Sequence, residues 1–381
     1  MKRKILYITG TRADYGLMRS ILFEMEKNQD IDLELVVTGM HLMNEFGMTI
    51  DDIKKDGFKF HEVTATFEED NKISMAKFIG NFIKSFSEYI LTINPDIILL
   101  LGDRGEMLAG AIVGAYLNIP TAHLHGGEIT STVDEYARHA ITKLVNIHLP
   151  ATEKSAERII KMGENPDNVF VVGAPGLDHI LNEKLVDPES ISVKYNLDLN
   201  EPIIILVQHP VTLESDKAIS KARMALEAIV ELKIKTIIIY PNADAGGRKI
   251  IELINEYENL YFIDSYKSIP SIDYLGLMSI ASVIVGNSSS GIIEAPSFKL
   301  PAVNIGSRQE GREKAINVID VDYDKEKIKS AILKAINDKE FKDTLNDLKN
   351  PYGDGKTGKR VVDILSNIKL DDKLMDKKLK L

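Results

Sequence analysis

The chain has 381 residues, of which 44% are hydrophobic and 27% charged, a composition typical of a globular protein with about two domains. With 47 Lys and Arg against 57 Asp and Glu the formal net charge is −10, so the surface repels nucleic acid and acidic membranes, and neither is expected as a partner. There are 0 Cys and no run of about 18 apolar residues, which excludes thiol chemistry and a membrane span and predicts a cytoplasmic protein.

Short β-branched segments recur along the chain, and nearly all end at Gly, Asp, His, Asn or Pro. In chain order they are KILYITG, LELVVTG, DIILLLGD, TAHLHGG, VFVVGAP, PIIILVQHP, KTIIIYPN, LYFIDS, SVIVGNS and AVNIG. The intervening segments have helical periodicity, as in SILFEMEKN from Ser20 and MALEAIVELK from Met224. This alternation predicts an α/β protein with doubly wound parallel sheets, in which polar residues just after the strands line the ligand crevice.

The domain junction is expected in the polar segment between about Pro175 and Pro202, which precedes a fresh strand. We therefore predict an N-terminal domain over residues 1–175 and a C-terminal domain over residues 176–365. Residues 366–381 form a helix end and a Lys-rich tail, which from composition alone can pack on either domain or remain solvated.

Polar residues follow the first and third predicted strands. In GTRADYG, backbone N–H groups and Arg12 can contact a phosphate or carboxylate, or the segment is a plain turn with a solvated Arg. This segment is not the G-x-G-x-x-G dinucleotide fingerprint. Asp103 is the last residue of DIILLLGD, and Arg104 follows it. The two residues form either an acid–base pair or a salt-bridged turn.

The segment HLHGGE carries three titratable side chains at a predicted strand end. His123 and His125 alternate along the strand and are expected to share one face. A His-x-His pair can ligate a metal, but no third ligand has obvious spacing, so acid–base work by His125 or Glu128 is favoured.

The segment TVDEYARH starts a predicted helix. Thr132 and Glu135 have the spacing of a capping box, and Asp134 lies in the same first turn. Both acids either complement the helix N-terminus or serve as ionised bases, with Arg138 one turn from Asp134.

The second half of the chain contains a candidate nucleotide site. His209 in QHP and Asn242 in YPNADAGG each follow a strand, and turn residues are the alternative for both. In GNSSSGIIEA, free N–H groups and the hydroxyls of Ser288, Ser289 and Ser290 favour a diphosphate cradle. Glu294 is placed to accept from ribose hydroxyls, and Arg308 in GSRQEGRE adds a cation.

Together these residues predict a nucleotide-diphosphate ligand between two doubly wound domains, with Arg12, Arg104 and Arg308 as the cations. No hydride-carrier fingerprint, P-loop or metal cluster accompanies them, so neither a metal nor another cofactor is expected.

The motifs resemble, over essentially the whole chain, the hydrolysing UDP-N-acetylglucosamine 2-epimerases of sialic acid biosynthesis, and more distantly the non-hydrolysing bacterial 2-epimerases. They are GTRADYG, VVTGMHL, LLGDRGE, HLHGGE, VDEYARHAITKL, QHPVT, YPNADAGG, GNSSSGIIEAPSF, NIGSRQEGR and NPYGDG. The resemblance implies the glycosyltransferase-B architecture, with two Rossmann-like domains, a UDP-sugar between them and a C-terminal helix that returns to the first domain. A homodimer or homotetramer is expected.

The resemblance also implies residue roles. Nucleotide contacts fall on Arg12, His209, Asn242, Ser288, Ser289, Glu294 and Arg308. Catalytic acids and bases fall on Asp103, His125, Asp134 and His209, with Glu135 adjacent. Many members have Glu at the position of His125 and some have His, a difference that bears on which group reprotonates carbon 2 and which sugar is accepted.

The implied reaction is elimination of UDP to 2-acetamidoglucal, followed by hydration with inversion at carbon 2, which converts UDP-N-acetylglucosamine to N-acetylmannosamine and UDP. One alternative is the same reaction on UDP- or GDP-N,N'-diacetylbacillosamine, in the legionaminic acid pathway. Two others are a glycosyltransferase, because the fold is shared, and a nucleotide-sugar sensor without catalysis.

Overall fold

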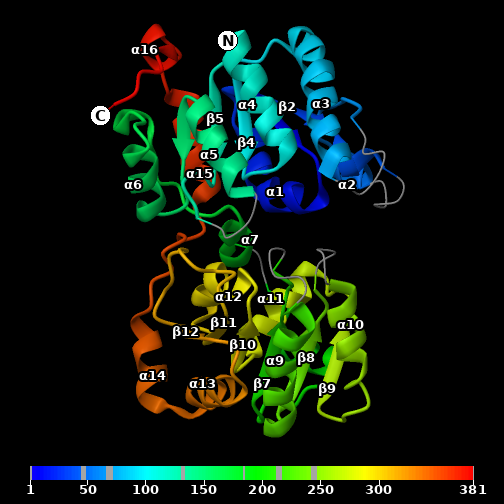
Figure 1. Ribbon diagram of the computed structural model, residues 1–381. Coiled ribbons are helices and arrows are strands. Elements are labelled where there is room, and N and C mark those ends of the chain that lie inside the picture. The colour runs from blue at the N-terminus through cyan, green and yellow to red at the C-terminus, as the bar shows by residue number, and fades with distance from the viewer. Residues whose placement is uncertain are drawn as a thin grey trace. The chain divides into compact units, whose positions relative to one another are not determined.

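The computed structural model describes two compact units (Figure 1). The described residues are 2–43, 49–65, 72–129, 134–182, 185–211, 217–241 and 247–380. Unit 1 comprises Met1–Glu128, Val133–His179 and Tyr352–Leu381, and unit 2 comprises Ile129–Thr132 and Ile180–Pro351.

Unit 1 contains a six-stranded, all-parallel sheet in the order β3-β2-β1-β4-β5-β6. Its strands are β1 Arg3–Thr9, β2 Ile31–Val37, β3 Phe60–Glu62, β4 Ile97–Leu101, β5 Thr121–Leu124 and β6 Ile147–Leu149. Its helices are α1 Arg12–Lys27, α2 Ile50–Asp56, α3 Lys72–Ile93, α4 Gly105–Leu117, α5 Asp134–Leu144, α6 Glu153–Lys161, α15 Thr357–Asn367 and α16 Asp372–Met375. Helix α7, Gly176–Asn182, contains the boundary between the units, which falls after His179. Two short 3-10 turns are η1 Gly39–Leu42 and η3 Pro166–Asn168.

Side-chain alternation along β1 divides the core of unit 1 into two layers. Ile5 and Tyr7 belong to the apolar cluster that also contains residues of α1 and α15. Leu6 and Ile8 belong to the cluster formed with α3 and α4. Because successive strand residues point to opposite faces, a continuous apolar strand is buried on both sides by helices.

Unit 2 has the same plan, with a parallel sheet in the order β12-β11-β10-β7-β8-β9. Its strands are β7 Ile203–Val207, β8 Lys235–Ile239, β9 Ile263–Tyr266, β10 Val283–Gly286, β11 Ala302–Ile305 and β12 Val318–Val321. Its helices are α8 Pro188–Tyr195, α9 Ala218–Leu232, α10 Gly247–Asn255, α11 Ser271–Ile280, α12 Ser290–Ile293, α13 Lys325–Asn337 and α14 Lys339–Thr344, with 3-10 turns η5 Ala295–Phe298 and η6 Leu345–Asp347.

The chain returns to unit 1 at Tyr352, so α15 belongs to unit 1, whereas the sequence boundary at residue 366 assigned it to the second domain. Helix α15 packs against α1 (Figure 1). The buried Asp178 carboxylate accepts hydrogen bonds from Thr357 N and Gly358 N, at 2.8 and 2.6 Å, which fixes the start of α15.

The predicted α/β class is confirmed, and nine of the ten predicted strand segments contain strands. VFVVGAP was wrongly predicted as a strand, because only Val169 forms a single bridge, with His148. The short strands β3, β6 and β12 were not predicted. No helix among the described residues is long and apolar enough to cross a membrane.

Candidate functional site

Both sheets have strand order 3-2-1-4-5-6 when strands are counted within each unit. In unit 1, the strands β1 to β3 are added toward one edge of the sheet and β4 to β6 toward the other, so the strand order reverses between β1 and β4. In unit 2 the same reversal lies between β7 and β10. Ligands of doubly wound sheets bind outside the carboxyl ends of the strands at this reversal. The predicted site residues around Arg12 and Asp103 follow β1 and β4, and those around His209 and Ser288 follow β7 and β10.

In unit 1, Arg138 connects two of the predicted acidic positions. Its side chain, on α5, is 5% exposed and forms an ion pair with the Asp103 carboxylate. Its Nη1 also donates to the backbone carbonyl of Glu128, at 3.1 Å. One buried guanidinium therefore fixes the turn after β4 and the loop after β5 in a single arrangement.

His125 and Glu128 form a second pair. Strand β5 ends at Leu124, and His125 has a φ of +62°, in the left-handed region. Its Nδ1 lies 2.5 Å from Glu128 Oε1. Because an ionised carboxylate only accepts, Nδ1 carries a proton in this contact, and Nε2 is the ring nitrogen that remains for exchange with a ligand.

His123 has a different role from His125. The expectation that the two rings share a strand face is wrong, because His125 lies beyond the end of β5. His123 is buried, and its Nε2 donates to the Gly102 carbonyl at 2.6 Å. Burial lowers the pKa of His123 to about 3, so this ring stays neutral and supports the turn that carries Asp103.

The loop after β1 packs around a buried carboxylate. Glu106 is 1% exposed, and a Cβ added at Gly10 would lie 2.4 Å from its Oε1, so a larger residue does not fit there. Arg104 caps α4, and its Nε lies 3.4 Å from Glu106 Oε2. The Arg12 side chain is 78% exposed and lies 3.5 Å from Asp52, so it is accessible to an anionic ligand.

Helix α5 carries the remaining predicted acids, Asp134 and Glu135. Glu135 is partly exposed and lies 3.3 Å from His139 Nε2, one turn along α5. The Asp134 side chain, Thr132 and Asn242 lie outside the described residues.

In unit 2, Asn287 joins the ends of β7 and β10. It is 0% exposed, accepts from His209 N at 2.7 Å and donates to His209 O at 2.8 Å. Gly286 before it has a φ of +124°, and a Cβ there would lie 2.1 Å from Val207 O. Only glycine permits this close approach of the two strand ends.

The serine segment after Asn287 is suited to hold an anion. No described residue accepts a hydrogen bond from the backbone N–H of Ser288 or Ser289, whereas Ser290 N donates to Ser288 Oγ at 3.3 Å. Nη1 of Arg308 donates to Asn287 O at 3.2 Å, which places this cation beside the segment. Glu294 lies at the end of α12, the short helix that starts at Ser290, and Pro296 lies in the 3-10 turn η5 that follows.

Sequence reasoning did not assign roles to three residues that support these groups. Asn287 and Gln309 are in contact, because Gln309 Nε2 donates a hydrogen bond to Asn287 O at 2.9 Å. Tyr274 lies near Ser290 and Glu294, and burial raises the pKa of its hydroxyl. The Asn287 side chain was part of the GNSSSG motif, but no sequence signal identifies Tyr274. No cluster of three or more His, Cys, Asp or Glu within the described ranges is placed to hold a metal ion.

The chain matches known proteins over most of its length. Residues 23–366 match the family model described as UDP-N-acetylglucosamine 2-epimerase. The UDP-N,N'-diacetylbacillosamine 2-epimerase (hydrolyzing) of Legionella pneumophila is 43% identical over 99% of both chains. The UDP-N-acetylglucosamine 2-epimerase of Neisseria meningitidis is 36% identical over 96% of this chain and 95% of that protein.

The fold of the chain is similar to that of solved UDP-GlcNAc 2-epimerase structures. The crystal structure of a UDP-GlcNAc 2-epimerase from Neisseria meningitidis bound to UDP-GlcNAc has a TM-score of 0.79 and 21% identity, over 95% of this chain and 99% of that chain. The two Rossmann-like units are thus those of the glycosyltransferase-B class. The chain belongs to the UDP-N-acetylglucosamine 2-epimerase family.

Proposed function

We propose that this protein is a hydrolysing 2-epimerase, which releases UDP and a free 2-epimerised sugar from a UDP-linked 2-acetamido sugar. The observation that carries the proposal is the pair of separate proton-transfer groups in unit 1, Asp103 and the His125–Glu128 pair, both attached to Arg138. Inversion at a carbon requires removal of a proton from one face and delivery to the other, and this takes two positioned groups.

In the proposed reaction, unit 2 holds the uridine diphosphate moiety. The N–H groups of Ser288 and Ser289 and the charge of Arg308 stabilise the diphosphate as the bond from carbon 1 to oxygen breaks. Ser290 adds a hydroxyl, Glu294 accepts from the ribose hydroxyls, and Asn242 and His209 complete the nucleotide contacts.

Unit 1 supplies the proton transfers. Asp103 takes the proton from carbon 2 as UDP departs, which leaves a 2-acetamidoglucal. Nε2 of His125, protonated before this step, then delivers a proton to the opposite face of carbon 2. Water adds its hydroxyl to carbon 1 and gives its remaining proton to Nε2, and Asp103 releases its proton to solvent. Arg12 and Arg104 contribute positive charge near the leaving group, and Asp134 and Glu135 supply the remaining carboxylates.

For the sugar, we favour UDP-N,N'-diacetylbacillosamine. Support comes from the hydrolysing diacetylbacillosamine enzyme of Legionella pneumophila, at 43% identity against 36% for the N-acetylglucosamine enzyme of Neisseria meningitidis. UDP-N-acetylglucosamine is the second candidate. A third comparison, with the GDP/UDP-N,N'-diacetylbacillosamine 2-epimerase (hydrolyzing) of Campylobacter jejuni at 34% identity, adds the GDP-linked sugar to the panel.

The test is turnover of these three sugar nucleotides without an acceptor. We expect release of nucleotide and free sugar, with the highest kcat/KM for UDP-N,N'-diacetylbacillosamine. A higher value for UDP-N-acetylglucosamine would reverse the choice of sugar. An enzyme that needs an acceptor sugar, or one that binds UDP without any turnover, would contradict the hydrolysing reaction.

A further inference from the structure

A polar cavity of about 160 Å³ lies in unit 1, between the turn after α6 and the C-terminal tail. None of the residues assigned above to the sugar-nucleotide reaction lines it. Its lining residues are Asn146, Glu164, Asn165, Asn168, Lys373, Leu374, Asp376, Lys377, Lys378 and Lys380.

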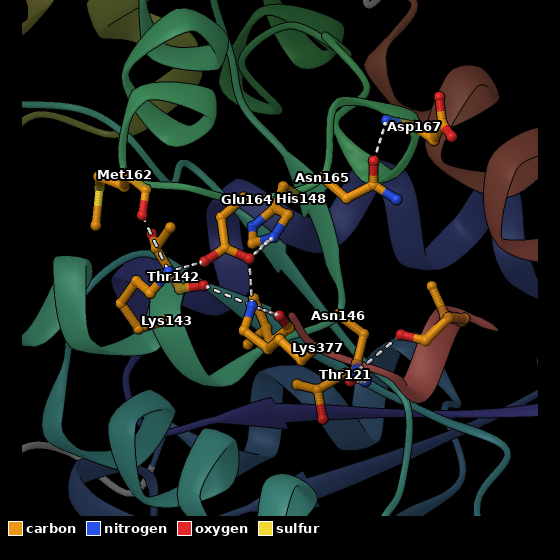
Figure 2. Close-up of polar contacts among 12 residues, drawn as sticks. Thr121, Thr142, Lys143, Asn146, His148, Met162, Glu164, Asn165, Asp167 and Lys377 are labelled. Atoms are coloured by element: carbon orange, nitrogen blue, oxygen red, sulfur yellow. Dashed lines mark hydrogen bonds and ion pairs between the residues drawn. The ribbon is translucent and has the colours of Figure 1, made fainter. Parts of the chain in front are cut away.

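Buried ion pairs form the base of this cavity (Figure 2). The Glu164 carboxylate is 4% exposed and accepts from Lys143 at 2.5 Å, from His148 Nε2 at 3.1 Å and from Lys377. Lys377 also donates to the carbonyls of Thr142 and Val145. Asn146 donates to Leu374 O at 3.3 Å, so the tail is anchored and the cavity has a fixed wall.

The lining carries excess positive charge. The lining contains four lysines and two carboxylates, Glu164 and Asp376, so its net charge is +2. Lys377 pairs with Glu164 and Lys378 pairs with Asp376 at 2.5 Å, which leaves the excess charge on Lys373 and Lys380. Lys373 lies 3.9 Å from Asp167, outside the lining. The whole chain has a net charge of −10, so this concentration of cations is local. A phosphate monoester carries a charge of about −1.5 to −2 at pH 7, which complements it.

Several donors around the cavity are available to a ligand. Among the described residues, none pairs with the Lys380 ammonium or with the Asn168 side chain. Asn165 uses its oxygen to accept from Asp167 N at 3.3 Å, and its amide nitrogen makes no hydrogen bond to the described part of the chain (Figure 2). Ammonium and amide N–H groups together suit a phosphate that carries hydroxyl groups.

The volume of the cavity and the type of its cations limit the class of ligand further. At about 30 Å³ per water molecule, the cavity holds roughly five waters, room for one phosphate group and a short hydroxylated chain. The cations that line the cavity are lysines, which bind phosphate as point charges. We propose that this cavity binds a small phosphate compound, with the phosphate at Lys373 and Lys380, which have no carboxylate partner within the lining, and hydroxyl groups at Asn165 and Asn168.

Calorimetric titration of the full chain with inorganic phosphate and with glycerol 3-phosphate, at constant ionic strength, tests this proposal. The variant Lys373→Gln/Lys380→Gln removes from the cavity the two charges that have no carboxylate partner in the lining. The matched control Lys359→Gln/Lys369→Gln removes two charges from exposed positions of the same C-terminal segment that do not line it. Phosphate bound elsewhere, including at Ser288, contributes equally to all three proteins.

We expect the cavity variant to bind at least about tenfold more weakly than the wild type, and the control to match the wild type. Tighter binding of glycerol 3-phosphate than of phosphate identifies an ester as the ligand, and equal binding identifies free phosphate. Equal affinities in the wild type, the variant and the control would overturn the proposal, as would the absence of saturable binding of both probes up to about 10 mM.

Discussion

Asn287 and His209 exchange two hydrogen bonds, at 2.7 and 2.8 Å, across the point where the strand order reverses in unit 2. The buried amide thus binds both backbone groups of a residue on the neighbouring strand end. The carbonyl of Asn287 in turn accepts from Arg308 and Gln309. The histidine, the serine segment and the arginine are therefore held in one rigid arrangement.

We predict that Asn287→Ala lowers the affinity for UDP by about tenfold and the free energy of unfolding by about 1–3 kcal/mol, because the His209 backbone loses both partners. UDP titration and urea denaturation measure the two effects. Asn200→Ala, at an exposed position of unit 2, is the control and should change neither. Unchanged UDP affinity in Asn287→Ala would separate this residue from the nucleotide site.

Arg308→Ala should weaken UDP binding by about 10- to 100-fold, because a charge-assisted hydrogen bond to a phosphate is lost. Arg223→Ala, which removes an exposed Arg paired with Glu256 in the same unit, should leave UDP affinity unchanged. Titration calorimetry at fixed ionic strength measures both. If the two variants bind UDP alike, Arg308 does not contact the nucleotide.

Asp103→Asn should reduce kcat by about 100- to 10,000-fold, because an amide cannot remove the proton from carbon 2. UDP affinity should stay within about twofold of the wild type, since Asp103 is placed at the sugar and not at the nucleotide. Steady-state kinetics and UDP titration of the same preparation separate the two quantities. Full turnover in this variant would remove Asp103 from the chemistry.

Glu164 gives a prediction for stability against pH. Burial alone would raise its pKa, but hydrogen bonds from His148, Lys143 and Lys377 lower the pKa to about 2, from an ordinary value of 4.5. A carboxyl group with a lowered folded-state pKa stabilises the fold above the unfolded pKa, and the contribution is lost as pH falls through the folded pKa. Glu164→Gln should therefore cost about 3 kcal/mol of unfolding free energy at pH 7, and less and less between pH 4.5 and pH 2.

Urea denaturation of wild type and Glu164→Gln across this pH range measures the difference. Glu157→Gln, at an exposed position on α6, is the control and should not change the pH dependence. A constant difference between wild type and Glu164→Gln from pH 7 to pH 2 would show that the ionisation of Glu164 is not what stabilises the fold.

The long apolar strands could be predicted from the sequence because they are buried on both faces and end at turn residues. Strands β3 and β6 were missed because they have only three residues. Strand β12 was missed because none of its residues is fully buried and the exposed Asp320 interrupts its apolar pattern. VFVVGAP has the composition of a strand, and Phe170 N and Val172 N donate to His148 O and Pro150 O at the end of β6. The pairing does not continue, because Ala174 N donates to Tyr352 O, and among the described residues only one bridge forms. Local propensity does not contain such long-range partners.

In the candidate site too, some features could be predicted from local sequence and others depend on long-range contacts. The positions of Asp103 and His209 just after strands could be predicted from the sequence, and the rule for doubly wound sheets made them candidates. The Asp103–Arg138 ion pair joins residues 35 positions apart in the sequence, and the link between His209 and Asn287 spans 78 positions. These contacts depend on the strand order, which the pattern of segments alone does not determine.

The most direct test of the hydrolysing mechanism is turnover of the UDP-sugar in deuterated water, with the products examined by NMR and mass spectrometry. Removal and return of the proton at carbon 2 predict a free sugar with inverted configuration that carries one deuterium at carbon 2, together with free UDP. A product that carries no deuterium at carbon 2, or one that remains linked to UDP, would contradict the account.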